Sequence, residues 1–140
     1  MPYLKTAQLP GEPIFIVLFD GVITPEDTLQ SYLETAHLWY DDLRKTGSHI
    51  IIDARTAEGN FIDTMGALRQ SVMQEQQLAE MMQHVQFYIV GTNALIKLYT
   101  HARQQQQFGG LNIPLFAGIE DALAAARTAI AQKQHTSTPS

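Results

Sequence analysis

An aspartate and an arginine stand where the chain leaves an apolar run, and their chemistry sets the first hypothesis. Asp53 follows the β-branched run 49–52, and Arg55 comes two positions later. In open α/β sheets the carboxyl ends of the strands present the groups that bind ligands, so both residues are candidates to bind a ligand or a partner. Arg55 could instead pair with Asp53 or with an anion, and the alternative role of Asp53 is that of a loop-capping carboxylate.

The segment Gly91-Thr92-Asn93 lies between an apolar run and a helical pattern. Backbone N–H groups at such a junction can bind an anion, which makes Thr92 a further candidate for ligand or partner binding. The segment lacks the additional glycines of a phosphate-binding loop. Capping of the following helix by Thr92 is the competing interpretation.

The remaining reactive side chains form no recognisable catalytic or metal-binding pattern. The chain has no cysteine, which excludes thiolate catalysis and cysteine-ligated zinc. Its histidines never occur in a His-x-x-x-His spacing, and no Gly-x-Ser-x-Gly motif is present. We therefore expect no metal, no cofactor and no enzymatic activity. An enzyme that uses Asp53, Asp63 and Arg55 is an alternative, although these residues make no complete catalytic set.

Apolar runs and amphipathic segments predict the elements that must position these residues. Strands are expected at 3–8, 14–19, 49–53, 85–90 and 113–116, and helices at about 25–45, 63–83, 93–107 and 120–132. The first helix is supported by Thr24 as N-cap and by Pro25 at its first position. The resulting order is β-β-α-β-α-β-α-β-α.

This order predicts a single-domain α/β fold with a mostly parallel, mixed sheet. Alternating strands and helices favour parallel strands joined by right-handed crossovers, whereas the two N-terminal strands can pair antiparallel through the turn 9–13. The run 50–52 has no polar alternation, which is typical of a strand covered on both faces. We expect one domain over residues 1–132 and a disordered tail over 133–140.

Length and composition agree with an ordinary globular domain. The 140 residues are 45% apolar and 16% charged. Fourteen acidic residues against nine scattered basic ones give a net charge of −5, so we expect no nucleic-acid partner. The N-terminal segment does not resemble a signal peptide, and no apolar run approaches the roughly 20 residues that span a membrane. We expect a cytoplasmic protein without a membrane span.

The ordered set of motifs resembles the STAS domain of the SpoIIAA-like family, which includes antagonists of anti-sigma factors. The strand that ends in Asp53 leads to Asp63-Thr64-Met65-Gly66-Ala67-Leu68, which is similar to the family's Asp-Ser-Ser/Thr-Gly-Leu at a helix start. The segments 87–91 and 113–123 resemble the fourth strand of the family and its closing strand and helix. The segment 20–27 equally matches the related SpoIIAA-like group that overlaps in fold with lipid-binding SEC14 modules.

Thr64 corresponds by position to the phosphoacceptor of STAS antagonists. At a helix N-terminus the helix dipole favours a phosphate, whereas Asp53 or Asp63 nearby would oppose it. Two features depart from the family pattern, because Met65 occupies the second hydroxyl position and the connection 54–62 is longer than the usual loop. The alternative is that Thr64 is an ordinary first-turn residue behind an Asp63 N-cap.

The resemblance implies a non-enzymatic regulatory module that binds a protein partner, with homodimerisation and phosphorylation of Thr64 as further expectations. The residues expected to contact a ligand or partner are Asp53, Arg55, Asp63, Met65, Gly66 and Thr92. The alternative function is a carrier or sensor for a small apolar ligand or lipid. Two sets of apolar residues on the second and third predicted helices could line an apolar cavity or an interface: Met65, Met73, Met81 and Met82, and Leu95, Leu98, Tyr99 and Phe108. A core stripe is the third interpretation of these methionines.

Overall fold

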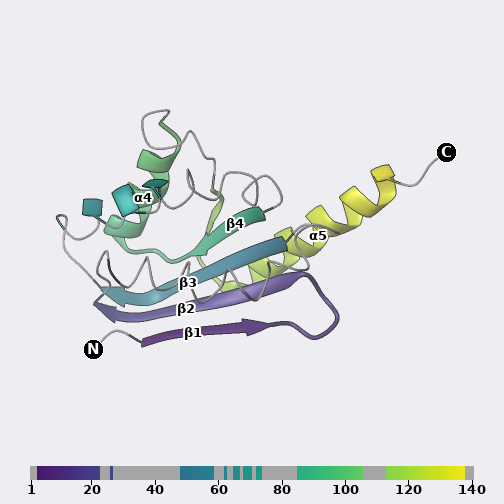
Figure 1. Ribbon diagram of the computed structural model, residues 1–140, viewed down its shortest axis with the longest axis horizontal. Helices are drawn as coiled ribbons and strands as arrows, with labels where there is room; N and C mark the ends of the chain where they lie inside the picture. The colour runs from purple at the N-terminus through teal and green to yellow at the C-terminus, as the bar shows by residue number, and fades with distance from the viewer. Residues whose placement is uncertain are drawn as a thin grey trace.

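A five-stranded mixed sheet forms the centre of the protein (Figure 1). The computed structural model describes residues 3–22, 26, 48–58, 62, 65–66, 68–70, 72–73, 85–105 and 113–137. The strands are β1 (Tyr3–Gln8), β2 (Ile14–Val22), β3 (Ser48–Glu58), β4 (Val85–Val90) and β5 (Leu115–Phe116), and they lie in the order β1-β2-β3-β4-β5. The helices labelled in Figure 1 are α4 (Ala94–Arg103) and α5 (Ile119–Ser137).

The strand directions confirm the predicted mixed sheet. β1 runs antiparallel to β2, and every later neighbouring pair is parallel. The turn between β1 and β2 contains Gly11, whose φ of 74° lies in the left-handed region that glycine adopts without strain. The Leu9 N–H donates to the Ile14 carbonyl at 3.0 Å and closes this turn.

Alternate residues of the strands build two apolar layers, one on each face of the sheet. One layer contains Phe15, Ile50 and Phe87, and residues Ile96 and Tyr99 of α4 pack against it. The other layer contains Ile14, Ile51, Tyr88 and Val90, together with Ala122 and Ala126 of α5. The absence of polar alternation in the central strands therefore reflects burial on both faces, as expected.

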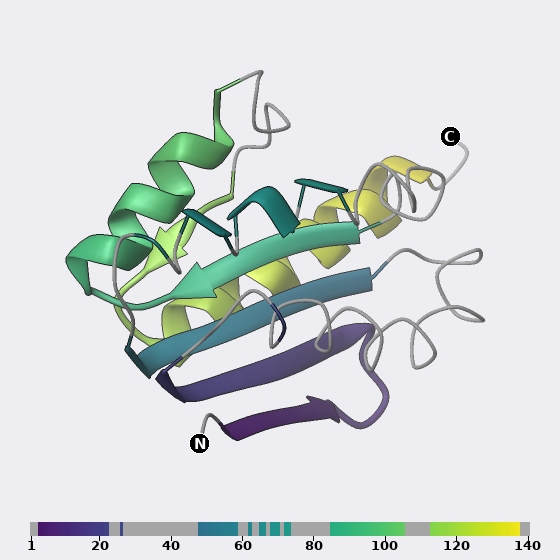
Figure 2. The ribbon, with the colours of Figure 1, turned by 60° about the vertical axis from the view of Figure 1, so that its left-hand side comes forward.

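The helices cover opposite faces of the sheet, as Figure 2 shows for α4 in green and α5 in yellow. Ala122 and Ala126 of α5 are fully buried against the strands. Because alanine has a short side chain, the helix backbone can lie close to the sheet. Arg127, one position further along α5, forms an ion pair with Glu12 of the β1–β2 turn at 2.9 Å between Nε and Oε1.

Several strands differ in length from the prediction. β2 and β3 extend to Val22 and Glu58 because the two strands continue to pair beyond the apolar runs. β5 is confined to Leu115–Phe116, although the prediction begins it at Ile113. Pro114 has no N–H to donate to a ladder, and only its carbonyl contributes, as an acceptor from the Ile89 N–H at 3.0 Å.

The helices also differ from their predicted bounds. α4 begins at Ala94 and ends at Arg103, within the predicted range 93–107. α5 continues to Ser137, so residues 133–137 are helical where we expect a disordered tail. Most of the predicted helix 25–45 lies outside the described residues. In the predicted helix 63–83, the described positions 65, 66, 68–70, 72 and 73 are helical, and the rest lie outside them.

Candidate functional site

Asp53 and Arg55 lie at an irregular point of β3. Leu18 of β2 faces Asp53, and Asp20 faces Thr56, so two steps along β2 correspond to three along β3. The extra residue in β3 is a β-bulge. Asp53 also marks the last position at which β3 pairs with β4, opposite Val90. The prediction that Asp53 ends its strand is therefore wrong, but Asp53 does end the pairing with β4.

The side chains of Asp53 and Arg55 form a bidentate ion pair, one of the two pairings that the sequence left open. Arg55 donates from Nε to Oδ1 at 2.9 Å and from Nη2 to Oδ2 at 3.0 Å. The Arg55 backbone N–H also donates to Oδ1 at 3.3 Å. The carboxylate thus holds the backbone of the bulge and the guanidinium together.

The two side chains of this pair differ in their exposure to solvent. The side chain of Asp53 is 7% exposed, whereas that of Arg55 is 51% exposed. The hydrogen bonds from Arg55 to Asp53 and the attraction of the carboxylate raise the pKa of Arg55 above its ordinary value. Arg55 therefore stays charged and presents part of its surface to solvent.

The connection between β4 and α4 has one of its backbone N–H groups engaged within the sheet. The Gly91 N–H donates to the Phe116 carbonyl at 2.8 Å, so it is not available to an anion. The N-cap of α4 is Asn93, whose Oδ1 accepts from the Leu95 N–H at 2.7 Å. The interpretation of Thr92 as the helix cap is therefore wrong by one position, and Thr92 is an exposed residue of the connection.

At Gly91, the connection between β4 and α4 lies against the bulge of β3. A Cβ atom placed on Gly91 would lie 3.5 Å from the Ala54 carbonyl oxygen and 3.5 Å from Ile96 Cγ2. The bulge of β3, the end of β4 and the end of β5 are thus neighbours at the carboxyl edge of the sheet. Of the predicted site residues, Asp53, Arg55 and Thr92 belong to this edge.

The other predicted site residues belong to the segment that follows β3. Asp63 and Thr64 lie outside the described residues. Met65 and Gly66 are helical and half-buried. Ile62, two positions before Thr64, is helical and 80% exposed.

Exposure along residues 62–73 follows the helical repeat. Ile62, Arg69 and Met73 are exposed, and on a helix positions seven and four apart return to the same face. Leu68, in contrast, is 1% exposed and belongs to the buried side. Ile62 and Met73 are two of the three exposed large apolar residues among those described, the third being Leu98 of α4. We call Ile62, Arg69 and Met73 the 62–73 surface.

Sequence reasoning did not single out Ile62. Its exposure depends on which side of the helix packs on the sheet, and Ile62 has the same residue type as the buried isoleucines of the core. The available signal was its spacing of seven and eleven residues from Arg69 and Met73.

The sequence does not reveal a further buried polar pair, formed by His49 and Tyr88. His49 Nδ1 and the Tyr88 hydroxyl form a hydrogen bond of 2.9 Å under α5, and burial raises the pKa of Tyr88. His49 belongs to β3 and Tyr88 to β4, so their proximity follows from the strand register and not from spacing along the chain.

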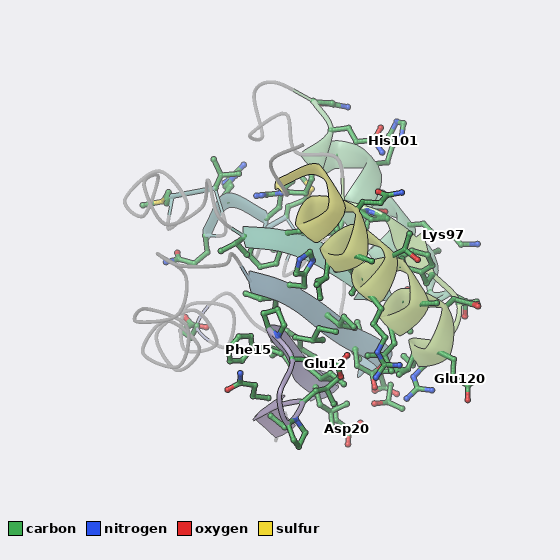
Figure 3. All side chains as sticks on the ribbon, turned by 90° about the vertical axis from the view of Figure 1, so that its right-hand side faces the viewer. Glu12, Phe15, Asp20, Lys97, His101 and Glu120 are labelled. Carbon is green, nitrogen blue, oxygen red and sulfur yellow. The ribbon has the colours of Figure 1, made fainter. Side chains whose placement is uncertain are left out.

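Within the part of the chain that the structure describes, no three histidine, aspartate or glutamate side chains gather as metal ligands would. Figure 3 labels two of the described carboxylates. Asp20 is exposed near the end of β2, and Glu120 opens α5 (Figure 3). Among the described helices, none has the length and apolar character to span a membrane.

Comparison with known proteins gives matches at the level of structure. No protein-family model matches the sequence, and the comparison with curated proteins finds no match. An uncharacterised protein of the DUF3478 family from Shewanella loihica PV-4, with a SpoIIAA-like fold, matches with a TM-score of 0.58 and 14% identity. The match covers 89% of this chain and 93% of that one.

An anti-sigma factor antagonist from Mycobacterium paratuberculosis also matches, with a TM-score of 0.52 and 15% identity. This match covers 91% of the present chain and 95% of the other. Both matches extend over about nine tenths of this chain. The chain is therefore a single domain with the SpoIIAA-like fold, the fold of STAS domains.

Proposed function

We propose that this protein is a non-enzymatic regulatory module that binds a protein partner through the 62–73 surface. The observation that carries the proposal is the exposure of Ile62, at 80%, and of Met73, at 53%, on the segment that also contains Thr64. Burying one such apolar side chain against a partner contributes about 1.5–3 kcal/mol. Arg69, exposed between them in the helical repeat, supplies a charge that can orient the partner.

The similar structures support a protein as the partner. The name of the M. paratuberculosis protein describes an action on an anti-sigma factor, which is itself a protein. The same fold in the present chain makes a protein ligand the best-supported class. The proposal places this binding in the cytoplasm, as the sequence predicts.

A phosphate on Thr64 would give this surface a switch. Thr64 lies two positions after Ile62 in the sequence, next to the carboxylate of Asp63. A phosphate adds a charge of about −1.5 to −2 at neutral pH. Because this charge would be added within two residues of Ile62 in the sequence, phosphorylation is expected to change the local potential and to weaken the binding of a partner that buries Ile62.

The carboxyl edge of the sheet has a supporting role in this proposal. Asp53 and Arg55 satisfy each other through two side-chain hydrogen bonds. This engagement favours a structural role for the pair over the alternative of an enzyme that uses Asp53, Asp63 and Arg55. The exposed part of Arg55 and the exposed Thr92 are proposed to lie at the margin of the partner's footprint.

Two measurements on protein purified from its native cells test the switch. Phosphopeptide mass spectrometry is expected to find phosphate on Thr64. Affinity capture is expected to recover the same partner with wild type and with Thr64→Ala, and to lose it with Thr64→Glu, which carries a charge at the same position. An unmodified Thr64 together with equal capture by both variants would contradict the switch.

The same preparation tests the alternative function. Native mass spectrometry of the purified protein is expected to give the mass of the polypeptide without a bound small molecule. A stoichiometric apolar ligand or lipid would instead support the carrier or sensor function.

A further inference from the structure

The outer edge of β1 is an end of the sheet that the proposed function does not use. The sheet order places β1 at one end, where it pairs with β2 on one side only, and no other described strand pairs with it. Figures 1 and 2 show β1, in dark purple, as the lowest strand of the sheet. An edge of this kind presents backbone N–H and C=O groups to a further strand.

The register between β1 and β2 shows which groups face outward. The Leu9 N–H bonds the Ile14 carbonyl, and this pair continues the register in which Ala7 faces Ile16 and Tyr3 faces Asp20. Hydrogen-bonded and non-hydrogen-bonded pairs alternate along an antiparallel ladder. Residues 3, 5 and 7 therefore bond to β2, whereas the backbone groups of residues 4, 6 and 8 point away from it.

The length of β1 selects one way of pairing two copies of this edge. When two β1 strands pair antiparallel about Thr6, Leu4 faces Gln8 and Thr6 faces Thr6, so all three outward-facing residues have a partner. Moving the centre by one residue to either side leaves Leu4 or Gln8 without a partner in the other β1, so hydrogen bonds are lost.

We propose that β1 pairs with β1 of a second copy of this chain, antiparallel and centred on Thr6. Every outward-facing residue of β1 then has a partner, and each pair exchanges two hydrogen bonds. Lys5 is the sole charged residue of β1. It faces Ala7 of the second copy, so no like charges stand opposite each other. Ala7 and Gln8 are exposed and open to this contact.

The symmetry of this pairing leaves the 62–73 surface accessible. The twofold axis is perpendicular to the sheet, so the two sheets become continuous and both α5 helices lie on the same face. In Figure 2 the described helical residues between 62 and 73 lie beside β4, on the far side of β2 and β3 from β1. The dimer and the proposed partner binding are therefore independent, and either can fail without the other.

A pair of single-cysteine variants tests the register directly, because the chain has no cysteine of its own. In the proposed dimer the two Thr6 Cα atoms lie about 5.5 Å apart, within the range of about 4.4–6.8 Å that a disulfide spans. The two Gln8 residues are four positions apart along the ladder, roughly 14 Å. Under mild oxidation Thr6→Cys is expected to form a disulfide-linked dimer roughly tenfold or more faster than Gln8→Cys, since pairing raises the effective thiol concentration. Equal rates, or no dimer from Thr6→Cys, would overturn the proposal.

A second pair of variants removes the backbone donor without a cross-link. Thr6→Pro deletes an outward N–H and leaves the ladder to β2 intact, whereas Thr6→Val keeps the N–H and a β-branched side chain. In sedimentation equilibrium Thr6→Val is expected to dimerise like wild type, and Thr6→Pro to have a dissociation constant raised by about tenfold or more. Circular dichroism checks that both variants are folded, and if Thr6→Pro does not fold the cysteine pair decides. Equal dissociation constants for wild type and a folded Thr6→Pro would contradict the pairing.

Discussion

Asp53 accepts hydrogen bonds from the backbone N–H and from the guanidinium of Arg55, and these bonds close around the bulge of β3. A buried carboxylate is costly unless it is paired and hydrogen-bonded. Arg55 meets this requirement while half of its side chain stays in solvent. The pair stabilises the point at which β3 separates from β4.

Replacement of Asp53 tests its structural role. Asp53→Ala removes the acceptors of three hydrogen bonds at a buried position and is expected to lower the free energy of unfolding by about 1–3 kcal/mol. Urea denaturation measures the change. Asp20→Ala is the matched control, because Asp20 is an exposed carboxylate near the end of the neighbouring strand, and it is expected to stay within about 0.5 kcal/mol of wild type. Equal effects of the two substitutions would contradict the role of Asp53.

At the scale of residues, the sequence indicated the chemistry of the carboxyl edge but not its geometry. The pairing of Asp53 with Arg55 was one of the stated possibilities, because the two residues are two positions apart. The sequence does not predict the bulge beside Asp53 and Arg55, because the bulge arises from the register of β3 against β2. The capping residue was missed by one position, because Thr92 and Asn93 both have side chains that can cap a helix.

At the scale of elements, the N-cap of α4 gives a direct comparison of those two neighbours. Asn93→Ala removes the acceptor of the Leu95 N–H and is expected to cost about 1 kcal/mol of stability. Thr92→Ala, at an exposed position outside the cap, is expected to change stability by less than about 0.5 kcal/mol. Thermal unfolding of the two variants measures the difference. A larger loss for Thr92→Ala would restore Thr92 as the cap.

The contact between α5 and the β1–β2 turn predicts a pH dependence. Hydrogen bonds from Arg127, assisted by its positive charge, hold the pKa of Glu12 below its ordinary value of 4.5 despite some desolvation. Because the pKa is lower in the folded than in the unfolded chain, the ion pair stabilises the fold above pH 4.5. This stabilisation is lost as the pH falls through the lowered pKa.

The measurement compares wild type with Glu12→Gln, which cannot ionise. The difference between their free energies of unfolding, from urea denaturation, is expected to be largest near neutral pH and to shrink below pH 4.5. A difference that stays constant over this range would show that the charge of Glu12 does not contribute.

The local sequence pattern predicts where the strands lie along the chain, but it predicts their ends less well. The apolar runs placed all five strands, and the turn with two prolines indicated the antiparallel β1–β2 pair. Ends were less predictable, because β2 and β3 extend through their mutual pairing and β5 is shortened at Pro114. The polar composition of residues 133–140 predicts a tail, but residues 133–137 continue α5 to Ser137.

At the scale of the whole molecule, the alternation of strands and helices was sufficient to predict the fold. Parallel strands need crossover connections, and the ordered motifs resemble a STAS domain, so the sequence predicts the mixed sheet of the SpoIIAA-like fold. The exposed side of the 62–73 segment was not predictable from composition. Ile62 is an ordinary core residue by type, and only the packing of Leu68 on the other side of the helix leaves it outside.

The central claim is that Ile62 contacts a protein partner, and quantitative affinity capture from native cells tests it most directly. Ile62→Asp is compared with Leu98→Asp, since Leu98 is also an exposed apolar residue but lies on α4. The account predicts that a partner recovered with wild type is recovered equally with Leu98→Asp. With Ile62→Asp its recovery is expected to fall about tenfold or more, in line with the loss of one buried apolar side chain. Undiminished recovery with Ile62→Asp, in a variant that unfolds like wild type, would contradict the account.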